Sequence, residues 1–191
     1  MAVKKAAKKA AAKPAETPQA ADKPKKASKY PYKKLVVPAA LQGVDNGKLS
    51  GKMLRPVKCG GQMWEGAADA FNQMYDQAIQ SGIKLRNVGD YRSFEAQYQL
   101  FKQRYSTVDL GRSPTVTRTY DNKVWYLRLG MAPSSTPGKS NHGLGLAIDL
   151  DVTTAKVLDW LCLNAPAFGF YLQSDDPSSP EFEAWHWQYC G

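Results

Sequence analysis

The chain contains only two histidines, and the segment after the first constrains the fold more than any other feature. After His142, large aliphatic residues alternate with small or acidic ones: Leu144, Leu146, Ile148 and Leu150 against Gly145, Ala147, Asp149 and Asp151. Period-two alternation puts the aliphatic side chains on one face of a β-strand and Asp149 on the other. We therefore expect a strand with a buried aliphatic face, an open face carrying the Asp149 carboxylate, and His142 on the turn that leads into it.

The second histidine lies in Glu183-Ala184-Trp185-His186-Trp187, where we expect a strand at about 185–189. Glu183 and His186 are three residues apart, so a regular strand would place their side chains on opposite faces. They can converge only if the chain turns or bulges near Ala184-Trp185, with Glu183 just before the strand proper. Otherwise His186 is an ordinary half-buried ring between two tryptophans.

Two imidazoles and one carboxylate suit a three-ligand zinc site with one open position, the arrangement of a catalytic zinc. If the segments converge, His142, Asp149 and His186 would hold a zinc that lowers the pKa of its water, and Glu183 would accept the proton. Arg92, at a predicted strand-to-helix junction, is a candidate to stabilise the oxyanion. The alternatives are that Asp149 only caps or hydrogen-bonds a neighbouring loop, and that Arg92 is an ordinary surface arginine.

The positive charge of the chain is concentrated at its N-terminus. Residues 1–34 contain eleven lysines and two acidic residues, which accounts for the whole formal charge of +9. Residues 35–191 contain fifteen basic and fifteen acidic residues, so this part is not a basic platform for nucleic acid. Residues 1–29 are rich in Ala, Lys and Pro and cannot bury enough apolar surface to order themselves, which predicts a disordered tail. Alternatively, the tail tethers the protein to a polyanion: a cell-wall polymer, a membrane surface or nucleic acid.

Residues 30–191 are long enough for one domain with a hydrophobic core. We find no apolar run near the roughly 18–20 residues that span a bilayer, and no apolar stretch after the basic N-terminus as in a secretory signal. Cys162 falls in an apolar helical stretch, where we expect it to be buried. The spacing leaves open whether Cys59 and Cys190 form a disulfide, and cytosolic synthesis argues against it.

Periodicity and turn residues predict the other elements. The predicted helices are an amphipathic one with core residues from Trp64 to Ile79 that ends at Ser81-Gly82, one from about Phe94 to Tyr105 capped by Ser93, and one from about Thr154 to Asn164. The predicted strands are Leu85–Tyr91 and a hairpin of Thr115–Tyr120 and Lys123–Leu129 joined by Asp121-Asn122.

Taken together, these motifs resemble a known family. The pattern Ser140-x-His142-x-x-Gly145-x-Ala147-x-Asp149, with the later Glu183-x-Trp185-His186, resembles the zinc D-alanyl-D-alanine carboxypeptidases of the VanY type, in the M15 peptidase group. Tyr91-Arg92-Ser93-Phe94-Glu95-x-Gln97 resembles the family's Tyr-Arg-Ser segment. Asn164-Ala165-Pro166-x-Phe168-Gly169-Phe170 resembles the stretch between its two metal motifs. The resemblance runs from about residue 31 to the C-terminus and leaves out the tail.

The resemblance implies a role for each of these residues. It implies one Zn²⁺ per chain held by His142, Asp149 and His186, Glu183 as the general base, Arg92 as the oxyanion stabiliser, and Ser140 and Gln97 as substrate contacts. The implied fold is α+β: a small central antiparallel sheet that carries the zinc site and is flanked by helices, as in hedgehog and D-Ala-D-Ala peptidase domains. Residues 30–191 would form this domain, which we expect to be a monomer. A hairpin insertion at about 106–137, similar to actinobacterial and phage versions, would form a wall or lid over the cleft.

The implied substrate is the stem peptide of peptidoglycan. A D-Ala-D-Ala carboxypeptidase is the leading hypothesis, and a phage-lysin endopeptidase that cuts L-Ala–D-Glu or a cross-bridge is the first alternative. A zinc-binding module without turnover, as in hedgehog domains, and a polyanion-binding protein are further alternatives. We expect synthesis in the cytoplasm without a signal peptide and action on the cell wall, after phage-mediated release or as part of a virion. A cytosolic dipeptidase also fits.

Overall fold

The computed structural model of this chain describes residues 28–109, 111 and 116–191. The tail predicted at 1–29 lies outside the described residues except for Ser28 and Lys29.

The described chain contains α-helices, β-strands and short 3₁₀ helices. The α-helices are α1 (Glu65–Gln80), α2 (Phe94–Arg104) and α3 (Ala155–Asn164). The strands are β1 (Leu54–Pro56), β2 (Gln62–Trp64), β3 (Asn87–Gly89), β4 (Tyr105–Ser106), β5 (Thr117–Tyr120), β6 (Lys123–Leu127), β7 (Ala147–Leu150), β8 (Phe170–Leu172) and β9 (His186–Tyr189). The 3₁₀ helices are η1 (Ala39–Leu41), η2 (Gly51–Met53), η3 (Asn141–Leu144) and η4 (Ala165–Phe168).

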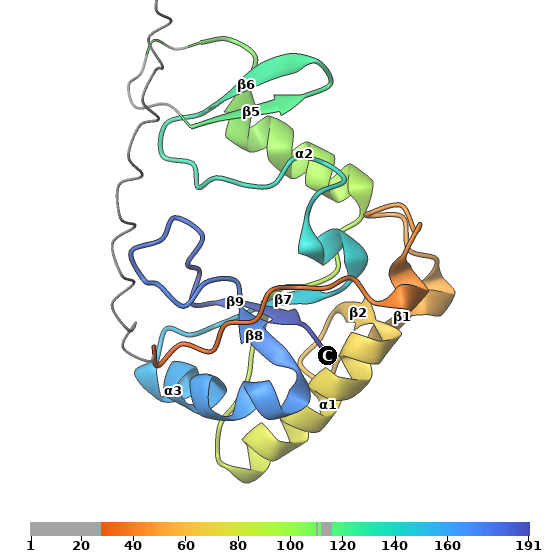
Figure 1. Ribbon diagram of the computed structural model, residues 1–191, viewed down its shortest axis with the longest axis vertical. Coiled ribbons are helices and arrows are strands. Elements are labelled where there is room, and N and C mark those ends of the chain that lie inside the picture. The colour runs from red at the N-terminus through yellow and green to blue at the C-terminus, as the bar shows by residue number, and fades with distance from the viewer. Residues whose placement is uncertain (1–27, 110, 112–115) are drawn as a thin grey trace, which may run out of the picture.

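A four-stranded antiparallel sheet with the order β3-β7-β9-β8 forms the centre of the fold. Figure 1 shows α1 and α3 on one side of this sheet, and α2 with β5 and β6 on the other. Two smaller sheets, β1-β2 and β4-β6-β5, lie outside it. The predicted α+β architecture, with a small antiparallel sheet flanked by helices, is therefore confirmed.

The core lies between the central sheet and α1. Phe71 and Met74 of α1 are fully buried, and the Phe71 ring meets Phe170 of β8 edge to face, with 5.8 Å between the centroids. Full burial of a side chain of this size stabilises the fold by roughly 1.5–3 kcal/mol. From the sheet side, Ile148 and Leu150 are fully buried, as their place in the alternating pattern predicted.

The end of α1 follows the predicted turn, but its last apolar residue does not. Gly82 adopts a left-handed φ of 68°, and Ile83 N donates to Ala78 O at 2.8 Å, which closes the helix at the predicted point. Ile79, predicted to be a core residue, is 49% exposed, so that part of the prediction is wrong. The buried stripe of α1 therefore ends one residue earlier, at Ala78.

The helix α2 and the hairpin pack together through aromatic rings. The predicted cap is confirmed, since Ser93 Oγ accepts a hydrogen bond from Ala96 N at 3.2 Å. Phe101 of α2 is fully buried, and its ring centroid lies 5.6 Å from that of Tyr120 and 5.0 Å from that of Trp125. These contacts attach the hairpin to α2.

The predicted hairpin turn is also confirmed. Asp121 and Asn122 have φ values of 52° and 54°, and β5 pairs with β6 on either side of them. Two consecutive left-handed residues are typical of the tight turn that matches the twist of the strands.

Several strands are shorter than predicted, and the one expected at Lys123–Leu129 ends at Leu127. The strand expected from Leu144 begins at Ala147, because Leu144 belongs to η3 and Gly145 has a left-handed φ of 64° that breaks the extended chain. The strand expected at Leu85–Tyr91 pairs only over Asn87–Gly89, where its register against β7 shifts.

The three cysteines all carry free thiols, so Cys59 and Cys190 do not form a disulfide. Cys162, expected to be buried, is half-buried on α3. In the part of the chain that the structure describes, we find no helix long and apolar enough to cross a membrane.

Candidate metal centre and cleft

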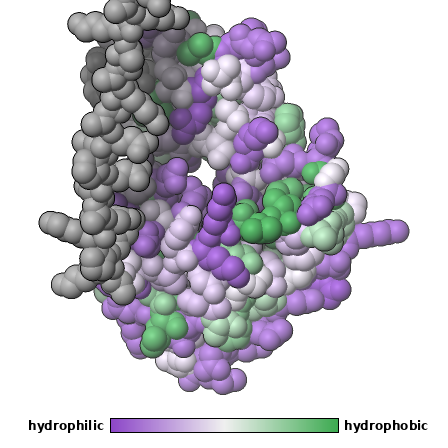
Figure 2. All heavy atoms as spheres, in the orientation of Figure 1, coloured by the Kyte–Doolittle hydropathy of each residue, from purple (hydrophilic) through white to green (hydrophobic). Residues whose placement is uncertain are grey.

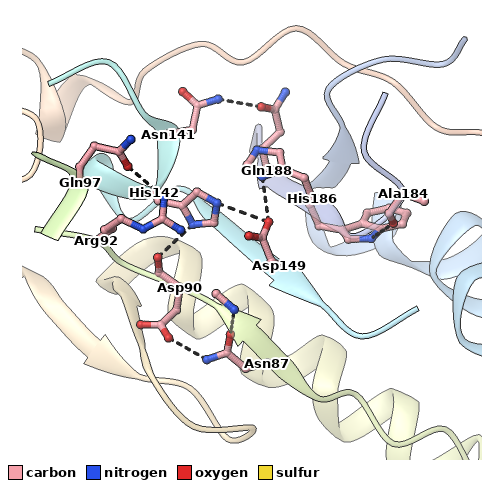
Figure 3. A network of polar contacts seen from close by, with 12 residues as sticks. Asn87, Asp90, Arg92, Gln97, Asn141, His142, Asp149, Ala184, His186 and Gln188 are labelled. Carbon is pink, nitrogen blue, oxygen red and sulfur yellow. Dashed lines mark hydrogen bonds and ion pairs between the residues drawn. The ribbon is translucent and has the colours of Figure 1, made fainter. Parts of the chain in front are cut away.

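The central sheet places three residues in one row across its strands. Gly89 of β3 lies opposite Asp149 of β7, which lies opposite His186 of β9. His142 comes from η3, just before β7, and Arg92 N donates to the His142 carbonyl at 3.1 Å. Figure 3 shows the rings of His142 and His186 both directed at the Asp149 carboxylate. The fold thus brings together two histidines that are far apart in the sequence.

His142, Asp149 and His186 are arranged as three ligands of one ion would be. A donor atom from each lies within 4.8 Å of the other two. His142 Nε2 is 3.4 Å from Asp149 Oδ1, and His186 Nδ1 is 3.0 Å from the same oxygen. Neighbouring ligands of a tetrahedral zinc, with bonds of about 2.0–2.1 Å, are roughly 3.3 Å apart. The two separations therefore agree with the edges of such a coordination shell.

The His142 ring is held in one tautomer by the backbone. Its Nδ1 lies 2.9 Å from the Asp90 carbonyl oxygen, which can only accept, so Nδ1 carries a proton and, in the neutral ring, Nε2 presents its lone pair. The Asp90 carboxylate is fixed in turn, because it accepts from Gln62 N at 3.1 Å and from Asn87 Nδ2 at 2.8 Å. An outer support of this kind orients metal-binding histidines in general.

The Asp149 carboxyl is ionised in this setting. Burial alone would raise its pKa, but the hydrogen bonds and charges of His142 and His186 outweigh burial and lower the pKa well below its usual range. On the far side of the His186 ring, Nε2 is buried and has no hydrogen-bond partner among the described residues. His186 is therefore aligned through Nδ1 alone.

A glycine makes room for the Asp149 carboxylate. A Cβ at Gly89 would lie 2.7 Å from Asp149 Oδ2 and 3.3 Å from its Cβ and Cγ. The atoms it would meet first all belong to Asp149, so a larger residue at this position would displace the carboxylate rather than the core.

The chain turns at Ala184-Trp185, as the spacing of Glu183 and His186 requires. His186 N donates to the Glu183 carbonyl at 2.9 Å, and β9 begins at His186. The predicted irregularity before the strand is confirmed. The half-buried Glu183 lines the same cleft as the three candidate ligands.

Arg92 also faces this cleft, and Gln97 holds it in place. Arg92 Nη1 donates to Gln97 Oε1 at 2.9 Å, and Gln97 Nε2 donates to the Ser135 carbonyl at 2.7 Å. Burial lowers the pKa of Arg92, the nearby Asp149 carboxylate raises it, and the positive charge of Arg104 lowers it further. Gln97 itself is only 2% exposed, so it affects the cleft through its hydrogen bonds to Arg92 and Ser135.

The cleft has a volume of about 480 Å³. The candidate ligands, Ser140, Arg92 and Glu183 line it together with residues of three further parts of the chain. These are Arg104 of α2 and Arg118 of β5; Ala132, Pro133, Ser134, Ser135, Lys139 and Asn141 between β6 and β7; and Gln173, Pro180, Glu181 and Trp185 between β8 and β9. Figure 2 shows the surface hollowed between the part that carries β5 and β6 and the main body, with mostly hydrophilic residues around the hollow. The segment 106–137 thus contributes to the cleft, as the wall hypothesis requires.

Sequence reasoning missed several residues of the site. Asp90 acts through its backbone carbonyl, which leaves no side-chain signature, although its place beside Tyr91-Arg92 could have drawn attention to it. Arg104, Arg118 and Lys139 also line the cleft, yet they belong to no motif, although Lys139 directly precedes the Ser140 pattern.

Residues 61–191 match the VanY family, described as D-alanyl-D-alanine carboxypeptidase. YodJ of Bacillus subtilis (strain 168) is 29% identical over 140 residues, which cover 65% of this chain and 45% of YodJ. The D-alanyl-D-alanine carboxypeptidase of Enterococcus faecalis (strain ATCC 700802 / V583) is 25% identical over 128 residues, which cover 62% of this chain and 44% of that protein. The chain thus spans about half the length of the curated relatives it matches.

Among solved structures, a mutant of the vancomycin-resistance D,D-pentapeptidase VanY from a VanB-type cassette, in complex with Zn(II), superposes with a TM-score of 0.53. It is 20% identical, and the match covers 76% of this chain and 80% of that one. At this identity the likeness shows a shared fold.

Proposed function

Since the chain belongs to the VanY family of D-alanyl-D-alanine carboxypeptidases, we propose that it is a zinc-dependent peptidase that removes the terminal D-Ala from peptidoglycan stem peptides. The observation that carries the proposal is the convergence of His142, Asp149 and His186 within 4.8 Å, in a cleft that also holds Glu183 and Arg92. A zinc-binding module without turnover would need neither Glu183 nor Arg92, so these two residues support a catalytic role.

The donor set supports zinc as the metal. Two imidazole nitrogens and a carboxylate oxygen leave one position open in a tetrahedral site, as in catalytic zinc centres. The tautomer that the Asp90 carbonyl imposes leaves His142 Nε2 free to bind, and the ionised Asp149 supplies the negative charge. When bound, zinc would act as a Lewis acid that polarises the peptide carbonyl and activates a water molecule.

The chain's own residues would supply the rest of the chemistry. We assign to Glu183 the transfer of a proton from the attacking water to the nitrogen of the leaving residue. Arg92 would donate hydrogen bonds to the carbonyl oxygen as negative charge develops on it, and Gln97 would keep the guanidinium oriented for this. Ser140, which lines the cleft and is 6% exposed, would contact the substrate beside the metal.

For the rest of the chain we propose the arrangement expected from the sequence. Residues 30–191 would form the peptidase domain and act as a monomer, and residues 1–29 would bind an anionic cell-wall polymer or nucleic acid through their lysines. Action on the cell wall, after phage-mediated release or as part of a virion, is part of this proposal.

The proposed activity can be tested on a stem pentapeptide that ends in D-Ala-D-Ala. We expect the zinc-loaded protein to release one D-Ala, detected by mass spectrometry of the shortened peptide. Glu183→Gln should lower kcat/KM on the order of 10²–10⁴-fold with zinc content unchanged, because it removes the proton acceptor. Glu181→Gln, which changes a neighbouring acid of the same cleft, serves as the matched control and should retain activity.

Two results would count against the proposal. Fragments cut inside the peptide, with the terminal residue retained, would favour the endopeptidase alternative. Unchanged hydrolysis by Glu183→Gln would remove Glu183 from the mechanism.

A further inference from the structure

Four cationic side chains line the cleft, and the proposed chemistry uses only Arg92. The others are Arg104 at the end of α2, Arg118 on β5 and Lys139 before η3. Residues 35–191 carry as many acidic as basic residues, so this concentration of positive charge does not reflect a basic domain. A zinc ion, if bound, would add two further positive charges to the same cleft.

Arg104 and Arg118 are available to an anionic ligand. Both are half-buried, and within the described ranges neither forms an ion pair with a carboxylate. Arg104 Nη1 donates to the Pro133 carbonyl at 3.0 Å, and Arg118 Nη1 donates to the Thr117 carbonyl at 3.0 Å. Each guanidinium carries five N–H donors in all, so most of them remain for a ligand.

The acidic residues of the cleft do not neutralise these arginines in the proposed site. Asp149 is a proposed metal ligand and Glu183 the proposed base, which leaves Glu181 on the opposite loop. Arg104 and Arg118 line the same cleft as Arg92, so the basic residues continue from the reaction centre towards the hairpin.

We propose that Arg104 and Arg118 form a subsite that binds a carboxylate of the substrate, a group distinct from the carbonyl of the scissile bond. The subsite selects acidic peptides over neutral ones. This proposal depends on the proposed function in one respect: a stem peptide is taken as the ligand. Arginine suits this role because its planar fork pairs with a carboxylate through two parallel hydrogen bonds. The carboxylate is either the free terminus of the leaving residue or an acidic group earlier in the peptide, and both present the same chemistry.

Binding can be measured without turnover by titrating peptides into zinc-loaded Glu183→Gln protein in a calorimeter. Three pentapeptides distinguish the sources: one with a free terminus and an internal acid, one amidated at the terminus, and one amidated at the internal acid. Adding Arg104→Gln and Arg118→Gln together should weaken binding of the fully acidic peptide by roughly 10- to 100-fold, the size of a lost charge-assisted pair.

Amidating the recognised carboxylate should weaken binding to the Glu183→Gln protein by a similar factor and remove the effect of the arginine substitutions. Arg128→Gln, on the exposed end of the same hairpin, is the control and should leave binding unchanged. The single variant Arg118→Gln is a second test in case the double variant does not fold. It should leave the fold intact, because the Arg118 hydrogen bond reaches only the adjacent Thr117.

The subsite is refuted if the doubly substituted protein binds the acidic peptide as tightly as its parent, or if neither amidation weakens binding. Absence of hydrolysis by the wild-type enzyme would instead refute the proposed activity, and the binding comparison would still test the subsite.

Discussion

Replacing Gly89 with alanine places a methyl group against the Asp149 carboxylate. The added Cβ would lie 2.7 Å from Asp149 Oδ2, about 0.7 Å closer than the 3.4 Å at which ordinary contact begins, so the carboxylate has to rotate or shift by a similar amount. A metal site tolerates displacements of only about 0.2 Å in its ligand distances. We therefore expect Gly89→Ala to lower zinc affinity by roughly 10- to 100-fold, the usual range for disturbing the support of a ligand.

The assay is a competition titration of the purified variant against a zinc-binding dye, with a thermal unfolding curve for each protein. Gly51→Ala is the matched control, since a Cβ at Gly51 meets nothing within 4 Å and should leave affinity unchanged. Overpacking should also cost about 1–3 kcal/mol in stability, and this cost should shrink in an Asp149→Ala background, where the clashing oxygen is gone. Zinc affinity equal to that of the wild type would refute the reasoning.

Three further outcomes follow from contacts around the site. Gln97→Ala removes the amide that orients Arg92, so kcat/KM for the pentapeptide should fall about tenfold while zinc content stays constant; loss of zinc instead would contradict the role as a positioning residue. Asn87→Ala removes one of the two hydrogen bonds to the Asp90 carboxylate, and zinc affinity in the same dye competition should fall about tenfold; an unchanged affinity would show that the Asp90 carbonyl keeps its place beside His142 without it. Burial raises the pKa of the Cys59 thiol from 9.0 to about 11, so its thiolate fraction at pH 8 is about a hundredfold below that of an exposed thiol. Iodoacetamide labelling followed by mass spectrometry should be correspondingly slow in the native protein at pH 8 and accelerate as the pH approaches 11; a native rate equal to that of the unfolded chain would be the contrary result.

Local sequence patterns predicted the structure correctly where the pattern is compatible with only one backbone geometry. The alternation around Asp149 predicted which face of the strand is buried, because side chains in a strand point to opposite faces in turn. The three-residue spacing of Glu183 and His186 predicted the turn at Ala184-Trp185, because a straight strand would have separated them. The alternation around Asp149 was misleading at Leu144, because alternation alone does not show that Gly145 takes a left-handed conformation.

The contacts that complete the site depend on how distant segments pair. The register that sets Gly89 opposite Asp149 arises from the pairing of β3 with β7 across 60 positions of sequence. The backbone carbonyl of Asp90 accepts a hydrogen bond from His142 Nδ1 regardless of the side chain at position 90. Arg118 reaches the cleft because aromatic packing sets the hairpin against α2, and its own neighbours in sequence give no sign of this.

The most direct test of the account is the position of bound zinc in crystals grown with the metal, located by anomalous scattering at the zinc absorption edge. We expect one zinc site per chain, at about 2.0–2.2 Å from His142 Nε2, Asp149 Oδ1 and His186 Nδ1, with a fourth position facing the cleft. Zinc bound elsewhere, for example at a cysteine, with these three side chains left uncoordinated, would contradict it.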